Sequence, residues 1–150
     1  MRTGVVSAAI AIAVAGSAVS AEEPRGHDPV LAELGAPVFA RYCASCHGPG
    51  GRGDGPTAKV LRTPPADLTG IAKRRDGQFP TSEIAKFIDG RFEFPAHGSR
   101  EMPVWGERFG ADVPESDVAE SIARGNIASL VEYLKSIQQP PLAAGKAKKK

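Results

Sequence analysis

Three stretches of this sequence carry apolar residues at the three- and four-residue spacing that predicts amphipathic helices. The first begins at Pro29, but Gly35 and Pro37 interrupt it, so the continuous helix is expected to begin near Ala36. Its apolar face consists of Val30, Leu31, Leu34, Val38, Phe39 and Tyr42. Gly35 lies four residues before Phe39, on the same side of this helix. Because glycine lets another backbone approach closely, we expect a second helix to cross there.

The other two stretches lie in the second half of the chain. Thr81 or Ser82 can cap a short helix. Its apolar positions are Ile84, Phe87 and Ile88. The strongest pattern runs from residue 115 to residue 138, is bent or broken near Gly125, and is stopped by Pro140-Pro141. Its apolar residues are Val118, Ile122, Leu130, Val131, Leu134 and Ile137.

Between these helices, glycine and proline predict irregular chain. Residues 48–56 are mostly turn-forming, and residues 56–61 suit a short helix with proline in its first turn. Pro64-Pro65 then forces an extended segment. Residues 91–110 show no convincing pattern of helix or strand. A long irregular segment inside a compact domain usually has a functional reason.

The N-terminus has the pattern of a secretory signal peptide. Arg2 precedes an uncharged apolar run over residues 5–19, and small residues lead to a cleavage site expected near Ala21. The run is shorter than the ~20 residues needed to span a bilayer, which favours export with cleavage over a retained anchor. We therefore divide the chain into a signal peptide (1–21), a lead-in segment (22–33), one domain (34–139) and a disordered basic tail (140–150).

The charge balance argues against one class of function. The sequence has 19 basic and 17 acidic residues, and four of the lysines lie at its C-terminal end. The body of the mature chain is therefore mildly acidic, and no nucleic-acid-binding face is expected. No membrane span is expected after the signal peptide has been removed.

Both cysteines lie in one short motif, Cys43-Ala44-Ser45-Cys46-His47. The arrangement C-x-x-C-H predicts covalent attachment of a c-type haem, with the histidine as the proximal iron ligand. A closed zinc site would need four nitrogen or sulfur ligands, and the only other histidines are His27 and His97. A thioredoxin-type CxxC would need a preceding strand, whereas the flanking residues have a helical pattern. A disulfide here would close too short a loop to constrain the unfolded chain much.

The other axial position of the predicted haem iron has its candidate ligand in the irregular segment. Met102 is the only methionine that remains after removal of the signal peptide, and it precedes Pro103. A methionine in a stiff loop downstream of C-x-x-C-H is placed to give the iron a thioether ligand. We expect Met102 to be the second axial ligand, with His97 as the alternative.

Further contacts with the haem are expected from the rest of the chain. A ligating histidine normally donates its other ring N–H to a carbonyl or carboxylate. The acceptor for His47 is expected to be the carbonyl of Pro65, with that of Pro56 less favoured. The residues expected to wrap the porphyrin are Phe39, Phe87, Ile88 and Trp105. The sequence does not decide which arginine would bind the propionates, and the candidates are Arg62, Arg74, Arg75 and Arg91.

The order of these features resembles that of the class I c-type cytochromes. The resemblance covers roughly residues 34–137. It is carried by the CxxCH motif, a glycine-rich loop and a Met-Pro loop, and by Gly35, Phe39, Cys43, Leu130 and Tyr133 in the first and last helices. It implies an all-α fold of three to five helices wrapped around one covalently bound haem c. The N- and C-terminal helices would cross, with Tyr133 near Gly35. The lysine-dense docking face of mitochondrial members is missing, so their partners give no guide here.

We therefore expect a diffusible, monomeric electron carrier of the bacterial periplasm rather than an enzyme. It would exchange single electrons with other periplasmic redox proteins, namely a dehydrogenase or a terminal oxidase. Ligation of the iron by both His47 and Met102 would leave no open site for a substrate. Two alternatives remain open. One is a haem c subunit of a larger oxidoreductase or oxidase complex, and the other is a haem sensor or enzyme with an open sixth site.

Overall fold

The computed structural model describes residues 26–91 and 102–142, and its regular secondary structure is helical throughout these two ranges. The α-helices are α1 (Pro29–Tyr42), α2 (Ala44–His47), α3 (Thr81–Asp89), α4 (Trp105–Arg108) and α5 (Ser116–Ser136), and short 3₁₀ helices span Ala58–Val60 and Lys73–Arg75. Since the described residues form no strand, the predicted all-α fold is confirmed. None of the described helices is long and apolar enough to cross a membrane. The predicted signal peptide, His97 and residues 143–150 lie outside the described residues.

Helix α1 begins earlier than the sequence predicted. It is continuous from Pro29, whereas we expected the continuous helix to begin near Ala36. The carboxylate of Asp28 accepts hydrogen bonds of 2.9 and 3.0 Å from the backbone N–H groups two and three residues further on, which caps the first turn. Pro37 lies inside α1 without ending it. The cap and the packing of α1 against α5 therefore offset the backbone hydrogen bond that Pro37 cannot make.

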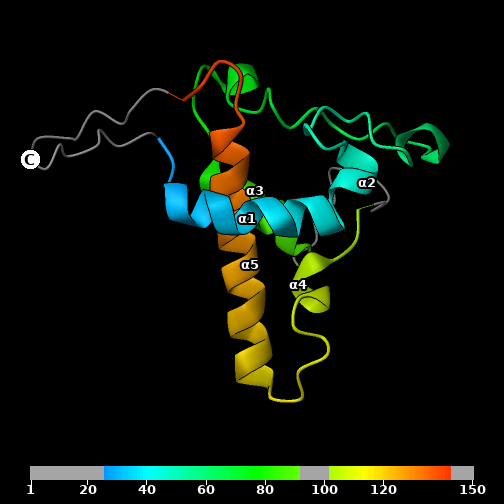
Figure 1. Ribbon diagram of the computed structural model, residues 1–150, viewed down its shortest axis with the longest axis vertical. Coiled ribbons are helices and arrows are strands. Elements are labelled where there is room, and N and C mark those ends of the chain that lie inside the picture. The colour runs from blue at the N-terminus through cyan, green and yellow to red at the C-terminus, as the bar shows by residue number, and fades with distance from the viewer. Residues whose placement is uncertain (1–25, 92–101, 143–150) are drawn as a thin grey trace, which may run out of the picture.

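The crossing of α1 over α5 is the main helix contact of the fold (Figure 1). At Gly35 the two backbones approach so closely that an added Cβ would collide with the carbonyl group of Ser129 and with Cβ of Tyr133. On the next turn of α1, the ring of Phe39 packs against that of Tyr133, with 5.0 Å between the ring centroids. The predicted crossing at Gly35, with Tyr133 beside it, is therefore confirmed.

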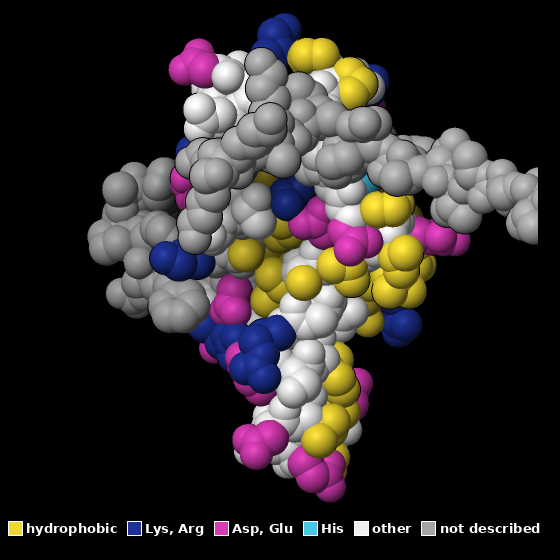
Figure 2. Space-filling view, turned by 90° about the vertical axis from the view of Figure 1, so that its left-hand side faces the viewer, with side chains coloured by type: hydrophobic (Ala, Val, Ile, Leu, Met, Phe, Trp, Pro, Cys, Tyr) yellow, Lys and Arg dark blue, Asp and Glu magenta, His cyan; other side chains and the backbone are white. Residues whose placement is uncertain are grey.

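The N-terminal part of α5 extends well beyond this crossing (Figure 1). It runs alongside the segment that follows α4, where an added Cβ at Gly110 would meet the backbone of Ala119. Apolar side chains lie on the surface along this part of the molecule (Figure 2). Among the apolar residues of α5, Val118 and Ile122 are exposed. The extra length of α5 thus supports the chain around α4 on one side and leaves the other side in solvent.

Helix α4 lies in a segment for which the sequence predicted neither helix nor strand. Its first residue, Trp105, is buried, and its ring lies 5.5 Å from that of Phe109 and 5.5 Å from that of Tyr42 at the end of α1. A single helical turn is too short to show a hydrophobic period, and tertiary packing holds it in place. The buried core that these rings join consists of Phe39, Ile88, Trp105, Phe109, Ala123, Ile127, Leu130, Val131 and Leu134.

Gln138 fastens the irregular middle of the chain to the end of α5. Its side chain is almost fully buried. The amide oxygen accepts a hydrogen bond from the backbone N–H of Ala72 at 2.9 Å, and the amide nitrogen donates to the carbonyls of Leu68 and Leu134 at 2.8 and 2.7 Å. This one polar residue therefore fixes the loop over residues 68–72 against the last turn of α5.

The close approach at Gly35 gives a testable prediction. In Gly35→Ala the new methyl group must push α1 away from α5, and such overpacking typically lowers the free energy of unfolding by about 1–3 kcal/mol. Denaturant unfolding of the haem-loaded protein, followed by circular dichroism, measures the change. Gly125→Ala is the matched control, because that glycine lies in α5 with no atom near its Cβ position, and the exchange should stabilise the helix by roughly 0.5–1 kcal/mol. Equal stability of the two variants would contradict the crossing.

Candidate haem-binding site

The CxxCH motif forms a turn that continues directly from α1. Cys43 follows the last residue of α1, and its carbonyl accepts backbone hydrogen bonds from Cys46 at 3.2 Å and from His47 at 2.9 Å. The motif is therefore helical and is not preceded by a strand within the described residues, as the sequence predicted. Gly48 then takes a positive φ of 77°, which turns the chain into the glycine-rich loop.

An apolar cavity of about 270 Å³ lies next to this turn. It brings together three of the four predicted site residues, Cys43, His47 and Met102, from distant parts of the chain. The rest of its lining is formed by Phe39, Ala66, Leu68, Ile71, Arg74, Arg75, Ile84, Phe87, Ile88, Leu130 and Leu134. Of the residues predicted to wrap the porphyrin, Phe39, Phe87 and Ile88 line the cavity, whereas Trp105 belongs to the aromatic cluster at the end of α1.

Cys46, the fourth predicted site residue, lies beside the cavity rather than in its lining. The hydroxyl oxygen of Thr57 lies 3.2 Å from the Sγ of Cys46 and 2.6 Å from the carbonyl oxygen of Ser45. An added Cβ at Gly55 would also collide with the carbonyls of the CxxCH turn. The glycine-rich loop is thus packed directly onto the backbone of the motif.

His47 is held in one orientation by a backbone carbonyl. Its Nδ1 lies 3.1 Å from the carbonyl oxygen of Ala66, so we assign the ring proton to Nδ1, which leaves Nε2 as the nitrogen that can bind a metal. Burial lowers the pKa of His47, and the hydrogen bond to Ala66 partly opposes that shift. The imidazole is therefore kept in the neutral form that ligates iron.

The acceptor for His47 corrects our prediction, which was the carbonyl of Pro65 or Pro56. The extended segment after Pro64 does run past the ring, as expected, but successive carbonyls of extended chain point in opposite directions. The carbonyl of Pro65 points toward Gly53, where an added Cβ would meet it, and the next carbonyl along the chain faces His47. The sequence therefore predicted which segment contacts His47, but not which carbonyl of that segment accepts the hydrogen bond.

The electrostatics of Cys43 argue against thiol–disulfide chemistry. Burial, and next the neighbouring Cys46, raise the pKa of the Cys43 thiol to about 11. A redox-active CxxC needs a thiolate at neutral pH and has its pKa lowered to achieve it. The zinc alternative also lacks support, because no group of three or more His, Cys, Asp or Glu residues in the described ranges could hold a metal ion.

Two of the four candidate arginines for the propionates lie at the cavity. Arg74 and Arg75 both line it, and both keep a partner on the protein. Arg74 donates to the carbonyl of Asp67 at 2.7 Å, and Arg75 forms a bidentate pair with Glu83 at 2.6 and 2.7 Å. Neither Arg62 nor Arg91 is part of the lining. The two arginines add guanidinium groups to the lining of an otherwise apolar cavity.

The residues that surround the cavity fit a haem. The walls are mainly aliphatic and aromatic, which suits the porphyrin plane, and the two arginines in the lining suit its anionic propionates. The imidazole of His47 and the thioether of Met102 are a donor pair typical of c-type haem iron. Three contributors could not be predicted from the sequence, namely Ala66, Gln138 and Thr57. Each acts through polar contacts of its backbone or side chain, which no periodic pattern predicts.

Comparison with known families agrees with this geometry. The family model for cytochrome c matches residues 32–138, which is most of the chain. The chain therefore belongs to the cytochrome c family, and it shares the family's covalent haem chemistry and its role in electron transfer. Searches of the curated proteins and of the solved structures found no significant match.

An apolar cavity in the middle of a small helical domain makes folding dependent on the group that fills it. We expect Cys43→Ala/Cys46→Ala, which cannot attach haem, to be largely unfolded, because the apolar lining of a cavity of about 270 Å³ would otherwise be left to water. Far-UV circular dichroism of the purified variant, beside the wild type matured with haem in the same host, measures the helix content. A native-like spectrum without haem would disprove this dependence.

Proposed function

We propose that this protein is a diffusible one-electron carrier of the bacterial periplasm. It carries one haem c, attached through Cys43 and Cys46, with His47 and Met102 as the axial iron ligands. The single observation that carries the proposal is the cavity that brings His47 and Met102 together although their positions in the sequence are far apart. Its periplasmic location is supported by the signal-peptide pattern of residues 1–21.

Occupation of both axial positions by side chains favours electron transfer over catalysis. If His47 and Met102 both ligated the iron, no position would be left there for oxygen or a substrate, and an electron could still enter or leave through the edge of the porphyrin. A neutral thioether opposite an imidazole favours Fe(II) and raises the reduction potential. The surrounding apolar side chains act in the same direction, because they disfavour the extra charge of the ferric state.

The protein contributes a fixed geometry to this exchange. The turn after α1 and the carbonyl of Ala66 hold the ring of His47 in place. Phe39 and Leu130, from the crossing helices, form part of an apolar wall that keeps water from the site. Fixed ligands and a dry site leave little to rearrange when the charge of the iron changes. That is what fast outer-sphere transfer requires.

The ligand assignment is tested by Met102→Ala. Oxidised wild-type protein should show the weak far-red charge-transfer band of an iron–thioether bond, and the variant should lose it, because no other methionine follows Met1 in the sequence. His97→Ala is the control and should keep the band. If Met102→Ala retained the band, or if only the His97 variant changed the spectrum, the assignment of Met102 would be wrong.

The alternative functions are separated by two further measurements. Rapid binding of CO to the reduced wild-type protein would favour a sensor or enzyme with an open sixth site, whereas no binding supports the carrier. Mass spectrometry of exported protein should give the chain from about residue 22 plus the mass of one haem. A bare polypeptide mass would overturn the proposal, and a protein isolated only inside a larger complex would favour the subunit alternative.

A further inference from the structure

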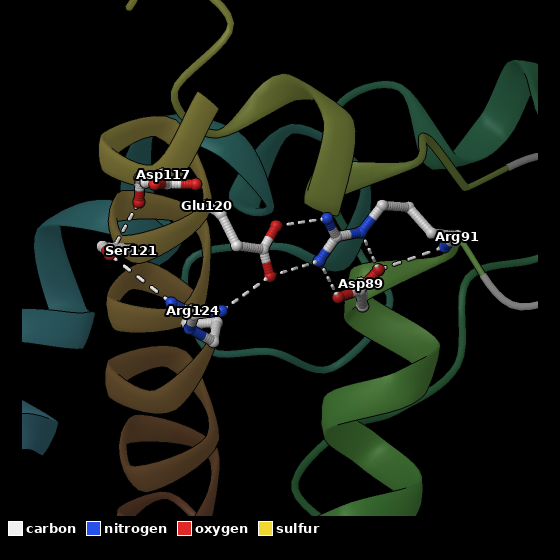
Figure 3. Close-up of polar contacts among 6 residues, drawn as sticks. All are labelled: Asp89, Arg91, Asp117, Glu120, Ser121 and Arg124. Carbon is white, nitrogen blue, oxygen red and sulfur yellow. Dashed lines mark hydrogen bonds and ion pairs between the residues drawn. The ribbon is translucent and has the colours of Figure 1, made fainter. Parts of the chain in front are cut away.

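One arginine outside the lining of the haem cavity joins three separate elements of the fold. Arg91 follows the end of α3, and its guanidinium donates to the carboxylate of Asp89 through Nε and Nη2, each at 2.7 Å. Through Nη1 it donates to Glu120 on α5 at 2.5 Å (Figure 3). Arg124 lies on the outer side of this network and donates to Glu120 at 3.2 Å.

The third element is α4, whose backbone rests directly on the ion pair. An added Cβ at Gly106 would collide with the carboxylate oxygen of Asp89 and with Nε of Arg91. Only a glycine at this position lets the helix come so close to the two charged groups. The network therefore fixes α4 against the end of α3 and against the N-terminal half of α5.

Met102 lies just before α4 and depends on its placement. Pro103 follows Met102 and restricts the backbone, and the buried Trp105 then begins the helix. Met102 itself lines the haem cavity, whereas Asp89, Arg91 and Glu120 do not. The network thus acts on the wall of the cavity that carries the thioether without touching the cavity.

The ion pairs favour the charged form of each of these three groups. The pKa values of Asp89 and Glu120 are lowered, mainly because both carboxylates accept hydrogen bonds from Arg91. The two carboxylates in turn raise the pKa of Arg91. Asp89 is buried, so a variant without Arg91 leaves its carboxylate without the bidentate partner. The bidentate geometry requires the planar fork of arginine, which lysine does not provide.

We propose that Arg91 is a positioning residue for the axial methionine: through Asp89, Glu120 and Gly106 it holds α4, and with it Met102, at the distance from His47 that the iron requires. This inference rests on the proposed ligation by Met102. If the network only stabilised the domain, its loss would weaken the whole fold equally. If it positions Met102, its loss weakens the iron–thioether bond more than it weakens the rest of the fold.

The test measures how easily an added ligand displaces Met102 from the oxidised protein. Imidazole is titrated into the full haem-loaded chain, and loss of the far-red band reports the midpoint concentration. Because imidazole binds only the form in which the thioether has left the iron, its apparent affinity rises with the population of that form. We expect Arg91→Met to lower the midpoint about tenfold or more, as loss of a charge-assisted bond implies, and Arg91→Lys to restore only part of it.

Matched variants separate positioning from general stability. Arg124→Gln also loses a hydrogen bond to Glu120 but leaves Arg91 in place, and Gly35→Ala weakens the fold away from the network. Arg124→Gln should keep the wild-type midpoint within about twofold, a change well under one charge-assisted hydrogen bond. Gly35→Ala should shift the midpoint less than Arg91→Met does at equal loss of unfolding free energy. Gly106→Ala, which disturbs the same contact from the α4 side, should behave like Arg91→Met. It also serves as the second variant if Arg91→Met does not accumulate.

The remaining outcomes distinguish a failure of the positioning role of Arg91 from a failure of the proposed ligation by Met102. If Met102→Ala removes the band but Arg91→Met and Gly106→Ala keep the wild-type midpoint, the positioning role is disproved and the proposed function stands. The positioning role also fails if Gly35→Ala shifts the midpoint as far as Arg91→Met does at equal loss of unfolding free energy. If Met102→Ala keeps the band, the proposed ligation fails, and the inference fails with it.

Discussion

The structure depends on the close crossing of α1 over α5 at Gly35. The absence of a side chain there lets the two backbones touch, and the same two helices then supply Phe39, Leu130 and Leu134 to one wall of the cavity. Because Cys43 follows the last residue of α1, this crossing also sets where the CxxCH turn stands against that wall. A single steric constraint thus links the packing of the domain to the position of the two sulfur atoms.

The remaining walls are built from chain with little regular structure, and polar contacts hold them. Buried backbone groups in irregular chain need partners that a helix would have supplied internally. The buried side chain of Gln138 provides two of them, for Leu68 and Ala72, and the carbonyl of Ala66 is satisfied by the ring of His47. The described residues contain no buried side-chain nitrogen or oxygen without a hydrogen-bond partner. The loop that orients the histidine is therefore as well determined as the helices.

The sequence predicted those parts of the fold that repeat a pattern. The apolar periods located α3 and α5, and Gly35 on a packed face predicted the crossing. The motif and a single remaining methionine pointed to Cys43, His47 and Met102, which the structure brings together around one cavity. The early start of α1 was missed because proline and glycine were given more weight than the cap at Asp28. Four-residue α4 could not be predicted, since its place depends on contacts with Tyr42 and with the network of Arg91, which lie far from it in sequence.

The two proposed axial ligands are held by very different means. His47 belongs to a turn that continues from α1, and a backbone carbonyl fixes its ring, so moving it requires the main helix contact of the domain to yield. Met102 precedes a single helical turn that is held by aromatic packing and by charged groups partly open to solvent. Local opening follows the segments with the fewest buried contacts. The thioether side is therefore the one at which this site should open first, and the ion pairs around Arg91 are placed where they resist that opening.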